Sequence, residues 1–261
     1  MSPRNRPRRP KSPLGFMPVL KCTFFLGRPV QLAHFRGALV EHIGRSRPLL
    51  ESLGLDGALF HGRDDNHPDW VDAGGRAIDH QKKVPVLNWP PVVYYRTDGQ
   101  HPVVVGVGPG ARALQLLLLS FARELQVEGR NVSILGWNGE RFNCPMGPAD
   151  DAEYLLEEYA FLKEAKDLEA YEATDRSGQR RLLEGKLVNH IVDLYASLGE
   201  DPGPGVSVTL LETVREGKRP GVDGPNERKV HTVRIRSNVH LPVEAGLGVG
   251  TSKGFGRILL G

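Results

Sequence analysis

Residues 246–256, near the C-terminus, are the stretch whose residue types point most directly to chemistry. Five of these eleven positions are glycine, and two cations, Lys253 and Arg257, lie in or beside the stretch. Glycine accepts positive φ and lets two backbones approach closely, and successive free N–H groups in such a loop form a concave nest for anions. We therefore predict a loop that contacts phosphate; the plain alternative is a tight turn between two terminal strands.

Nine histidines and many Lys and Arg side chains are compatible with a reaction that needs no metal. RNA is cleaved when its own 2′-hydroxyl attacks the adjacent phosphate, which leaves a 2′,3′-cyclic phosphate and a 5′-hydroxyl. A base that titrates near pH 7 assists this attack, which favours His, and cations or N–H groups stabilise the charge on the phosphoryl oxygens. Composition alone does not choose among the histidines.

Three other motifs give weaker evidence of a function. Residues 103–111 hold a Gly-x-Gly-x-x-Ala pattern between a predicted strand and a predicted helix, but the acidic residues about twenty positions on, Glu124 and Glu128, lie inside that helix rather than ending a strand. His34 and His42 lie two helical turns apart without evident partners for zinc, and the aspartates of residues 64–72 lack the spacing of a calcium loop. We expect no metal and no small-molecule cofactor.

Hydrophobic patterns place the elements that would position these groups in two halves. The first half has predicted strands over 19–26, 56–60 and 101–106, extended segments over 84–87 and 91–95, and helices over 30–42 and 109–127. Residues 136–151, rich in Gly, Pro, Asn and Asp, indicate a boundary, and residues 153–162 are ambiguous between strand and helix. The second half has a predicted helix over 179–198, then strands over 206–214 and 230–240 around a loop over 217–226.

Composition bounds the class of protein. A chain of 261 residues suits one large or two small domains; no apolar run is long enough to span a membrane, and two distant cysteines, Cys22 and Cys144, argue against a disulfide framework. We expect a cytoplasmic protein. Residues 1–40 carry eight Lys and Arg and no acid, whereas the remainder carries 26 against 31 acids. Residues 1–17 therefore predict a disordered basic arm, which either binds nucleic acid or only solubilises the chain.

The pattern Gly-Leu-Gly, five residues, Gly-Phe-Gly resembles the glycine-rich loop of the CRISPR repeat-RNA processing endoribonucleases of the RAMP superfamily. Residues 233–242 resemble the last long strand of that family. The resemblance implies an α+β fold of two tandem ferredoxin-like (RRM-like) domains, here residues 18–135 and 136–261, after the flexible basic arm of residues 1–17. It also implies that the loop contacts the RNA backbone, through Gly246, Gly248, Gly250, Lys253, Gly254, Gly256 and Arg257.

One branch of this family carries a His-x-His-like segment just after its second strand. The matching residues here are Phe60-His61-Gly62-Arg63, so the resemblance implies that His61 is the base, with Arg63 in place of the second histidine and His67 as its possible replacement. The implied function is metal-independent cleavage of CRISPR repeat transcripts into guide RNAs. Two alternatives stay open: a non-catalytic subunit that binds repeat RNA in a CRISPR effector or transposon-associated complex, and a structural subunit that coats the guide RNA.

Overall fold

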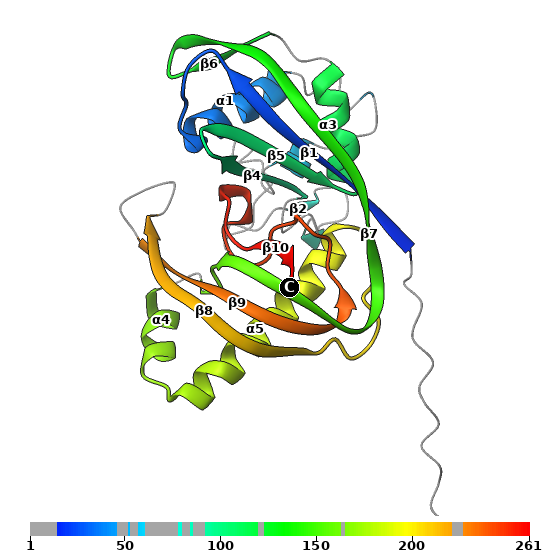
Figure 1. Cartoon of the computed structure of the whole chain (residues 1–261), viewed down its shortest axis with the longest axis vertical. Coiled ribbons are helices and arrows are strands. Elements are labelled where there is room, and N and C mark those ends of the chain that lie inside the picture. Colours follow the sequence, from blue (N-terminus) through cyan, green and yellow to red (C-terminus); the bar gives the residue numbers. More distant parts are fainter. Residues whose placement is uncertain are drawn as a thin grey trace, which may run out of the picture.

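The computed structural model of the chain describes residues 15–45, 52, 57–60, 78–79, 84–85, 92–119, 123–162, 165–220 and 227–261. Over this part of the chain the fold is mixed α/β, built on an antiparallel sheet of eight strands. Six of them follow the order β4-β5-β1-β7-β9-β8, and β6 and β10 also pair with β7. Strand β7 (Arg130–Tyr159) runs through both halves of the molecule (Figure 1).

The first half has the strand order of a ferredoxin-like unit, because β4, β5, β1 and the start of β7 are neighbours in that order. Its elements are β1 (Gly15–Leu26), α1 (Leu32–Arg45), η1 (Gly57–Phe60), β4 (Val93–Asp98), β5 (His101–Val107), α3 (Pro109–Leu119) and β6 (Glu124–Val127). A short hairpin of β2 (Ile78–Asp79) and β3 (Val84–Pro85) lies outside the main sheet.

The second half repeats that order with β8, β9, the end of β7 and β10. Its further elements are α4 (Ala165–Glu172), α5 (Arg176–Ser197), β8 (Val208–Pro220), β9 (Glu227–His240), η3 (Thr251–Lys253) and β10 (Arg257–Leu260). Residues 241–256, which include the glycine-rich stretch, stand where a ferredoxin-like unit has its second helix. The loop and β10 lie between the two halves of the molecule (Figure 1).

Several predicted elements need correction. Residues 136–151, expected as an irregular boundary, belong to β7, because residues 134–146 pair with β1 and that ladder satisfies their backbone groups. The ambiguous residues 153–162 continue β7 as far as Tyr159. The expected strand over residues 56–60 is the 3₁₀ helix η1, and β1 begins at Gly15, inside the expected arm. Residues 1–14 lie outside the described residues.

The second predicted helix is also shorter than expected. Helix α3 ends at Leu119, and residues 124–127 form β6, where Leu125 and Val127 alternate with exposed neighbours as a strand requires. Glu128 and Gly129, both at positive φ, then turn the chain into β7. Of the loop expected over 217–226, residues 217–220 belong to β8, which continues to Pro220, and residues 221–226 lie outside the described residues.

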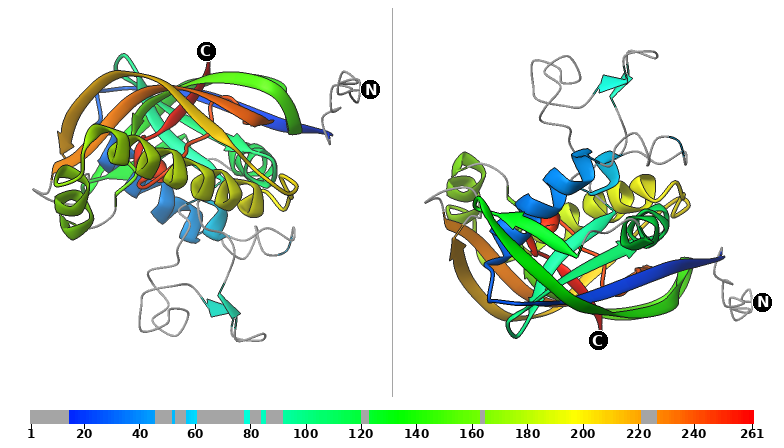
Figure 2. Two further views of the ribbon diagram at one scale, coloured as in Figure 1. Left: turned by 90° about the horizontal axis from the view of Figure 1, so that it is seen from below. Right: turned by 90° about the horizontal axis from the view of Figure 1, so that it is seen from above.

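The helices α1, α3 and α5 lie on one side of the sheet (Figure 2). The core between them and the sheet is continuous across both halves; in the first half Phe24 of β1 meets Phe35 of α1 with ring centroids 5.3 Å apart. No helix in the described ranges is long and apolar enough to cross a membrane.

Candidate nucleic-acid interface between the two halves

The glycine-rich loop is packed against protein on both sides. Gly254 lies against the edge strand β4. A side chain at this position would bring its Cβ 3.0 Å from the Tyr95 carbonyl oxygen, and the φ of Gly254 is +92°. Gly246 lies against the Tyr94 ring, and Gly248 lies against the Tyr159 ring of β7. The loop therefore joins the free edge of the first half to the second half.

Five backbone N–H groups of this loop are already engaged, three within the loop itself and two with residues 158 and 160. The amides of Leu247, Val249, Lys253, Gly254 and Gly256 all donate to backbone carbonyls, over 2.7–3.2 Å. The prediction of successive free N–H groups is wrong at these five positions. What the glycines supply here is a tight, left-handed backbone that lets two halves of the molecule approach each other.

A cleft of about 380 Å³ opens beside this loop. It has four arginines and two glutamates in its walls, drawn from both halves of the molecule; the lining residues are Leu32, Arg96, Thr97, Glu157, Glu158, Arg215, Arg219, Gly254 and Arg257. Arginine presents a planar fork of donors that fits a phosphate group. The cleft therefore has the side-chain chemistry of a phosphate-binding surface.

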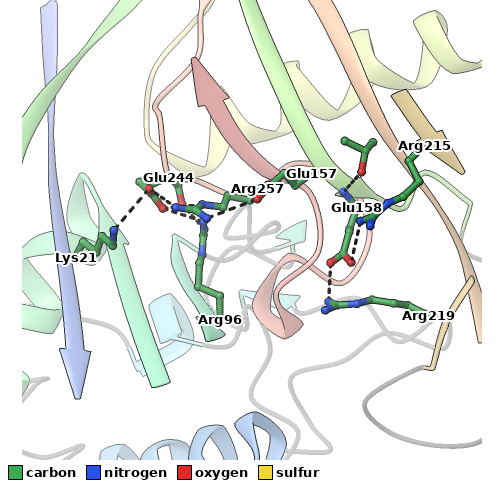
Figure 3. Close-up of polar contacts among 9 residues, drawn as sticks. Lys21, Arg96, Glu157, Glu158, Arg215, Arg219, Glu244 and Arg257 are labelled. Atoms are coloured by element: carbon green, nitrogen blue, oxygen red, sulfur yellow. Dashed lines mark hydrogen bonds and ion pairs between the residues drawn. The ribbon is translucent and has the colours of Figure 1, made fainter. Parts of the chain in front are cut away.

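One pair of these arginines is held by a buried carboxylate, Glu244 (Figure 3). Its oxygens accept hydrogen bonds from Arg96 of β4 at 2.9 Å and from Arg257 of β10 at 2.7 and 3.0 Å, and Lys21 of β1 lies 3.9 Å away. Arg96 also donates to the Glu244 carbonyl, and Arg257 reaches Glu157 at 3.5 Å. Because its partners come from β1, β4 and β10, Glu244 ties the halves together.

The charges of this cluster support one another. Burial disfavours ionised Glu244, but the hydrogen bond from Arg257 and the charges of Arg96 and Lys21 outweigh it and lower the pKa of this carboxyl. Burial lowers the pKa of Arg96 to about 10, against the charge of Glu244, so Arg96 remains a cation at pH 7. Glu244 and Arg96 are therefore both ionised near neutrality.

The other pair of arginines belongs to Glu158 (Figure 3). Its carboxylate lies 2.7 Å from an Arg219 Nη and 3.6 Å from an Arg215 Nη, both on β8. Arg219 also lies over the Phe255 ring at 5.9 Å, within the distance at which a cation and a ring attract each other.

The predicted site residues have different outcomes. His61, Arg63 and His67 lie outside the described residues. Of the predicted RNA contacts, Gly254 and Arg257 line the cleft, whereas Gly246, Gly248, Gly250 and Gly256 face protein atoms. Lys253 lies in η3, partly exposed.

Two of the other histidines have partners outside the cleft lining. His34 of α1 meets Glu128, at the turn after β6, at 3.3 Å. His190 of α5 lies 2.7 Å from the Tyr159 hydroxyl, and burial together with Lys186 lowers its pKa to about 4. Within the described ranges, no three His, Cys, Asp or Glu side chains gather as metal ligands would.

Sequence reasoning missed most of the cleft. Arg215 and Arg219 carry a readable signal, because residues four apart in a strand point to the same face. Neither Glu158 nor Glu244 shows such a signal in the sequence. Both are non-glycine residues at positive φ, +51° and +71°, in irregular backbone that the sequence does not predict.

No protein-family model matches the sequence, and no curated protein matches it either. Solved structures do resemble the fold. One described as a crystal structure of Cas6b has a TM-score of 0.66 at 17% identity, covering 95% of this chain and 100% of that chain. A second, described as a crystal structure of the CRISPR RNA processing endoribonuclease Cas6b, has a TM-score of 0.58 at 14% identity, again covering 95% and 100%. The prediction of a tandem ferredoxin-like fold of this type is thereby confirmed.

Proposed function

We propose that this chain, which shares the fold of the Cas6b structures, binds CRISPR repeat transcripts and cuts them into guide RNAs without a metal. The observation that supports this most directly is the cleft, where Arg96, Arg215, Arg219 and Arg257 converge from both halves beside the glycine-rich loop. Arginine clusters of this kind bind the RNA backbone, which carries one negative charge per linkage.

The reaction proposed is an internal transfer at one phosphodiester. The 2′-oxygen forms a bond to phosphorus and loses its proton to His61, the bond from phosphorus to the 5′-oxygen breaks, and that oxygen takes a proton from water. The products are a 2′,3′-cyclic phosphate and a 5′-hydroxyl. Arginine side chains offset the charge that develops on the phosphoryl oxygens. A positioned general base of this kind typically contributes 10²–10⁴-fold to the rate.

The first prediction concerns His61. We expect the full-length protein to cut repeat RNA from its own host in the presence of a chelator, and a single 2′-deoxy substitution at the cleaved linkage to abolish cutting, because the nucleophile is missing. We expect His61→Ala to slow single-turnover cleavage by about 10²–10⁴-fold with nearly unchanged RNA affinity. His101→Ala is the matched control, since His101 is an exposed residue at the start of β5 outside the cleft lining.

Two outcomes would redirect the proposal. Normal cutting by His61→Ala would place the base elsewhere, and His67, His34 and His42 would be tested in that order. Tight binding of repeat RNA by the wild type without any cutting would favour a non-catalytic subunit, whose partners would be other subunits of a CRISPR effector complex.

A further inference from the structure

Glu158 reaches the cleft where two neighbouring strand pairs, β7 with β9 and β9 with β8, are both irregular. The register of β7 against β9 shifts between Leu156 and Tyr159, and Glu158 has a φ of +51°. The register of β8 against β9 shifts between Thr213 and Arg215. Such bulges redirect side chains out of the regular ladder. Glu158 and Arg215 thus meet in the cleft from two distorted strands.

The backbone of Glu158 is tied to its surroundings while its side chain is not buried. Its N–H lies 3.3 Å from the Thr232 hydroxyl, and its carbonyl accepts from Gly256 of the glycine-rich loop at 3.2 Å. The Glu158 side chain is 21% exposed, and the side chains of Arg215 and Arg219 are 68% and 48% exposed. Water and ions therefore have access to this pair, and such pairs are weak.

The carboxylates of Glu158 and Glu244 differ in how far they and their arginine partners are exposed to solvent. Glu244 is 10% exposed and holds buried Arg96 in a network that joins the halves, so removing it would leave a buried cation without its partner. Glu158 holds arginines that are already solvated. A phosphate group that accepts charge-assisted hydrogen bonds from both guanidinium groups binds more strongly than one weakly paired carboxylate does. The contact of Arg219 with the Phe255 ring, at 5.9 Å, does not involve the carboxylate.

From this geometry we propose that Glu158 is a resident counter-anion. Its carboxylate occupies the place of a backbone phosphate between Arg215 and Arg219, and a nucleic acid must displace it to enter the cleft (Figure 3). This inference rests on the proposed function. Glu158 is then a specificity-determining residue, because weak single anions fail to displace it while a chain of phosphates, with several contacts at once, succeeds.

The second prediction concerns the direction in which RNA affinity changes when the Glu158 carboxylate is removed. We expect Glu158→Gln to bind repeat RNA roughly three- to tenfold tighter than the wild type at fixed salt, because no carboxylate competes with phosphate. Arg219→Gln should bind more weakly. The matched control is Glu153→Gln, which removes the same charge from an exposed pair with Arg236 at 2.7 Å; Glu153 lies on β7, like Glu158, but outside the cleft lining. We expect its RNA affinity to change little.

A second measurement separates this inference from the proposed function. Inorganic phosphate, with no RNA present, should raise the melting temperature of Glu158→Gln more than that of the wild type or Glu153→Gln. If the wild type binds no repeat RNA but phosphate still stabilises Glu158→Gln selectively, the anion site stands and the proposed function fails. RNA affinity of folded Glu158→Gln equal to or below that of Glu153→Gln, or identical phosphate shifts in the three proteins, would overturn the inference.

Discussion

At the scale of single residues, the pair of Tyr159 and His190 connects the glycine-rich loop to helix α5. The Tyr159 ring lies under Gly248, and its hydroxyl lies 2.7 Å from His190 Nδ1. A neutral imidazole can accept this hydrogen bond on that nitrogen, whereas the protonated form cannot. Burial, which lowers the pKa of His190 to about 4, keeps the ring neutral at pH 7.

The third prediction is a pH dependence of stability. Between about pH 6.5 and pH 4 the unfolded chain binds a proton at His190 that the folded protein does not, so the free energy of unfolding falls as the pH falls through this window. A pKa lowered this far contributes up to about 3 kcal/mol to that loss.

Urea unfolding from pH 7 to pH 4 measures this loss. We expect His190→Gln to flatten the pH dependence, because glutamine does not titrate, while exposed His101→Gln leaves the wild-type slope in place. An unchanged slope in His190→Gln would assign the effect to other groups. Buried His231, whose pKa burial also lowers, would be tested next.

At the level of single residues, the expectation of positive φ in the glycine-rich stretch is confirmed at Gly254 and Gly256, while the RNA contacts of these glycines stay predictions. The sequence could not reveal Glu158 or Glu244, because their positions depend on bulges and on partners far away in the chain. Arg96, for example, meets Glu244 across 148 positions.

At the scale of elements, the glycine-rich loop stands where a ferredoxin-like unit has its second helix, and it lies between the two halves of the molecule (Figure 1). Gly254 has a φ of +92° and lies against the Tyr95 carbonyl of β4. Gly203, in the segment before β8, has a φ of +82° and no atom within 4 Å of the place where a Cβ would stand. The two glycines thus share a left-handed backbone, in which alanine would be strained, but differ in packing, which makes them a matched pair.

The fourth prediction compares these two positions. We expect Gly203→Ala to cost about 1–2 kcal/mol in free energy of unfolding, the usual penalty of a left-handed alanine. We expect Gly254→Ala to cost more, because β4 must also move, and to weaken RNA binding since Gly254 lines the cleft. Denaturant titrations and RNA affinities of the two variants check this. Equal losses of stability would show that the contact with β4 is unimportant.

Helices and strands were predictable where hydrophobic residues recur at a regular spacing. They were not predictable where the composition of a segment suggests a turn. The buried positions of α5 recur at helical spacing, at Leu183, Leu187, Ile191 and Leu194, and that helix was predicted nearly in full. Residues 136–151 have turn-like composition, yet pairing with β1 and β9 makes them strand. Tertiary pairing of this kind overrides local preference.

At the scale of the whole molecule, the two halves share a strand, an ionic cluster and a core. Strand β7 pairs with β1 in one half and with β9 and β10 in the other. The larger hydrophobic cluster contains Val104 of β5 as well as Ile191 of α5. Neither half therefore completes its sheet without the other, and the division at residue 136 stays a prediction.

The fifth prediction follows from this sharing. We expect one cooperative unfolding transition, in which hydrogen exchange of the Val104 and Ile191 amides reports the same free energy of opening. Native-state exchange in low denaturant measures both amides in one experiment. Two separate values, each with its own denaturant dependence, would mean that the halves unfold as independent domains.

The continuity of β7 also bears on how such chains can be recombined during evolution. A crossover between two related genes anywhere within residues 130–159 would join a strand shaped for one partner sheet to a strand shaped for another. Exchange of a complete half as a module is therefore unfavourable in this architecture. Variation is tolerated more readily at connections such as residues 199–207, between α5 and β8, where a change in length leaves both strand ladders intact.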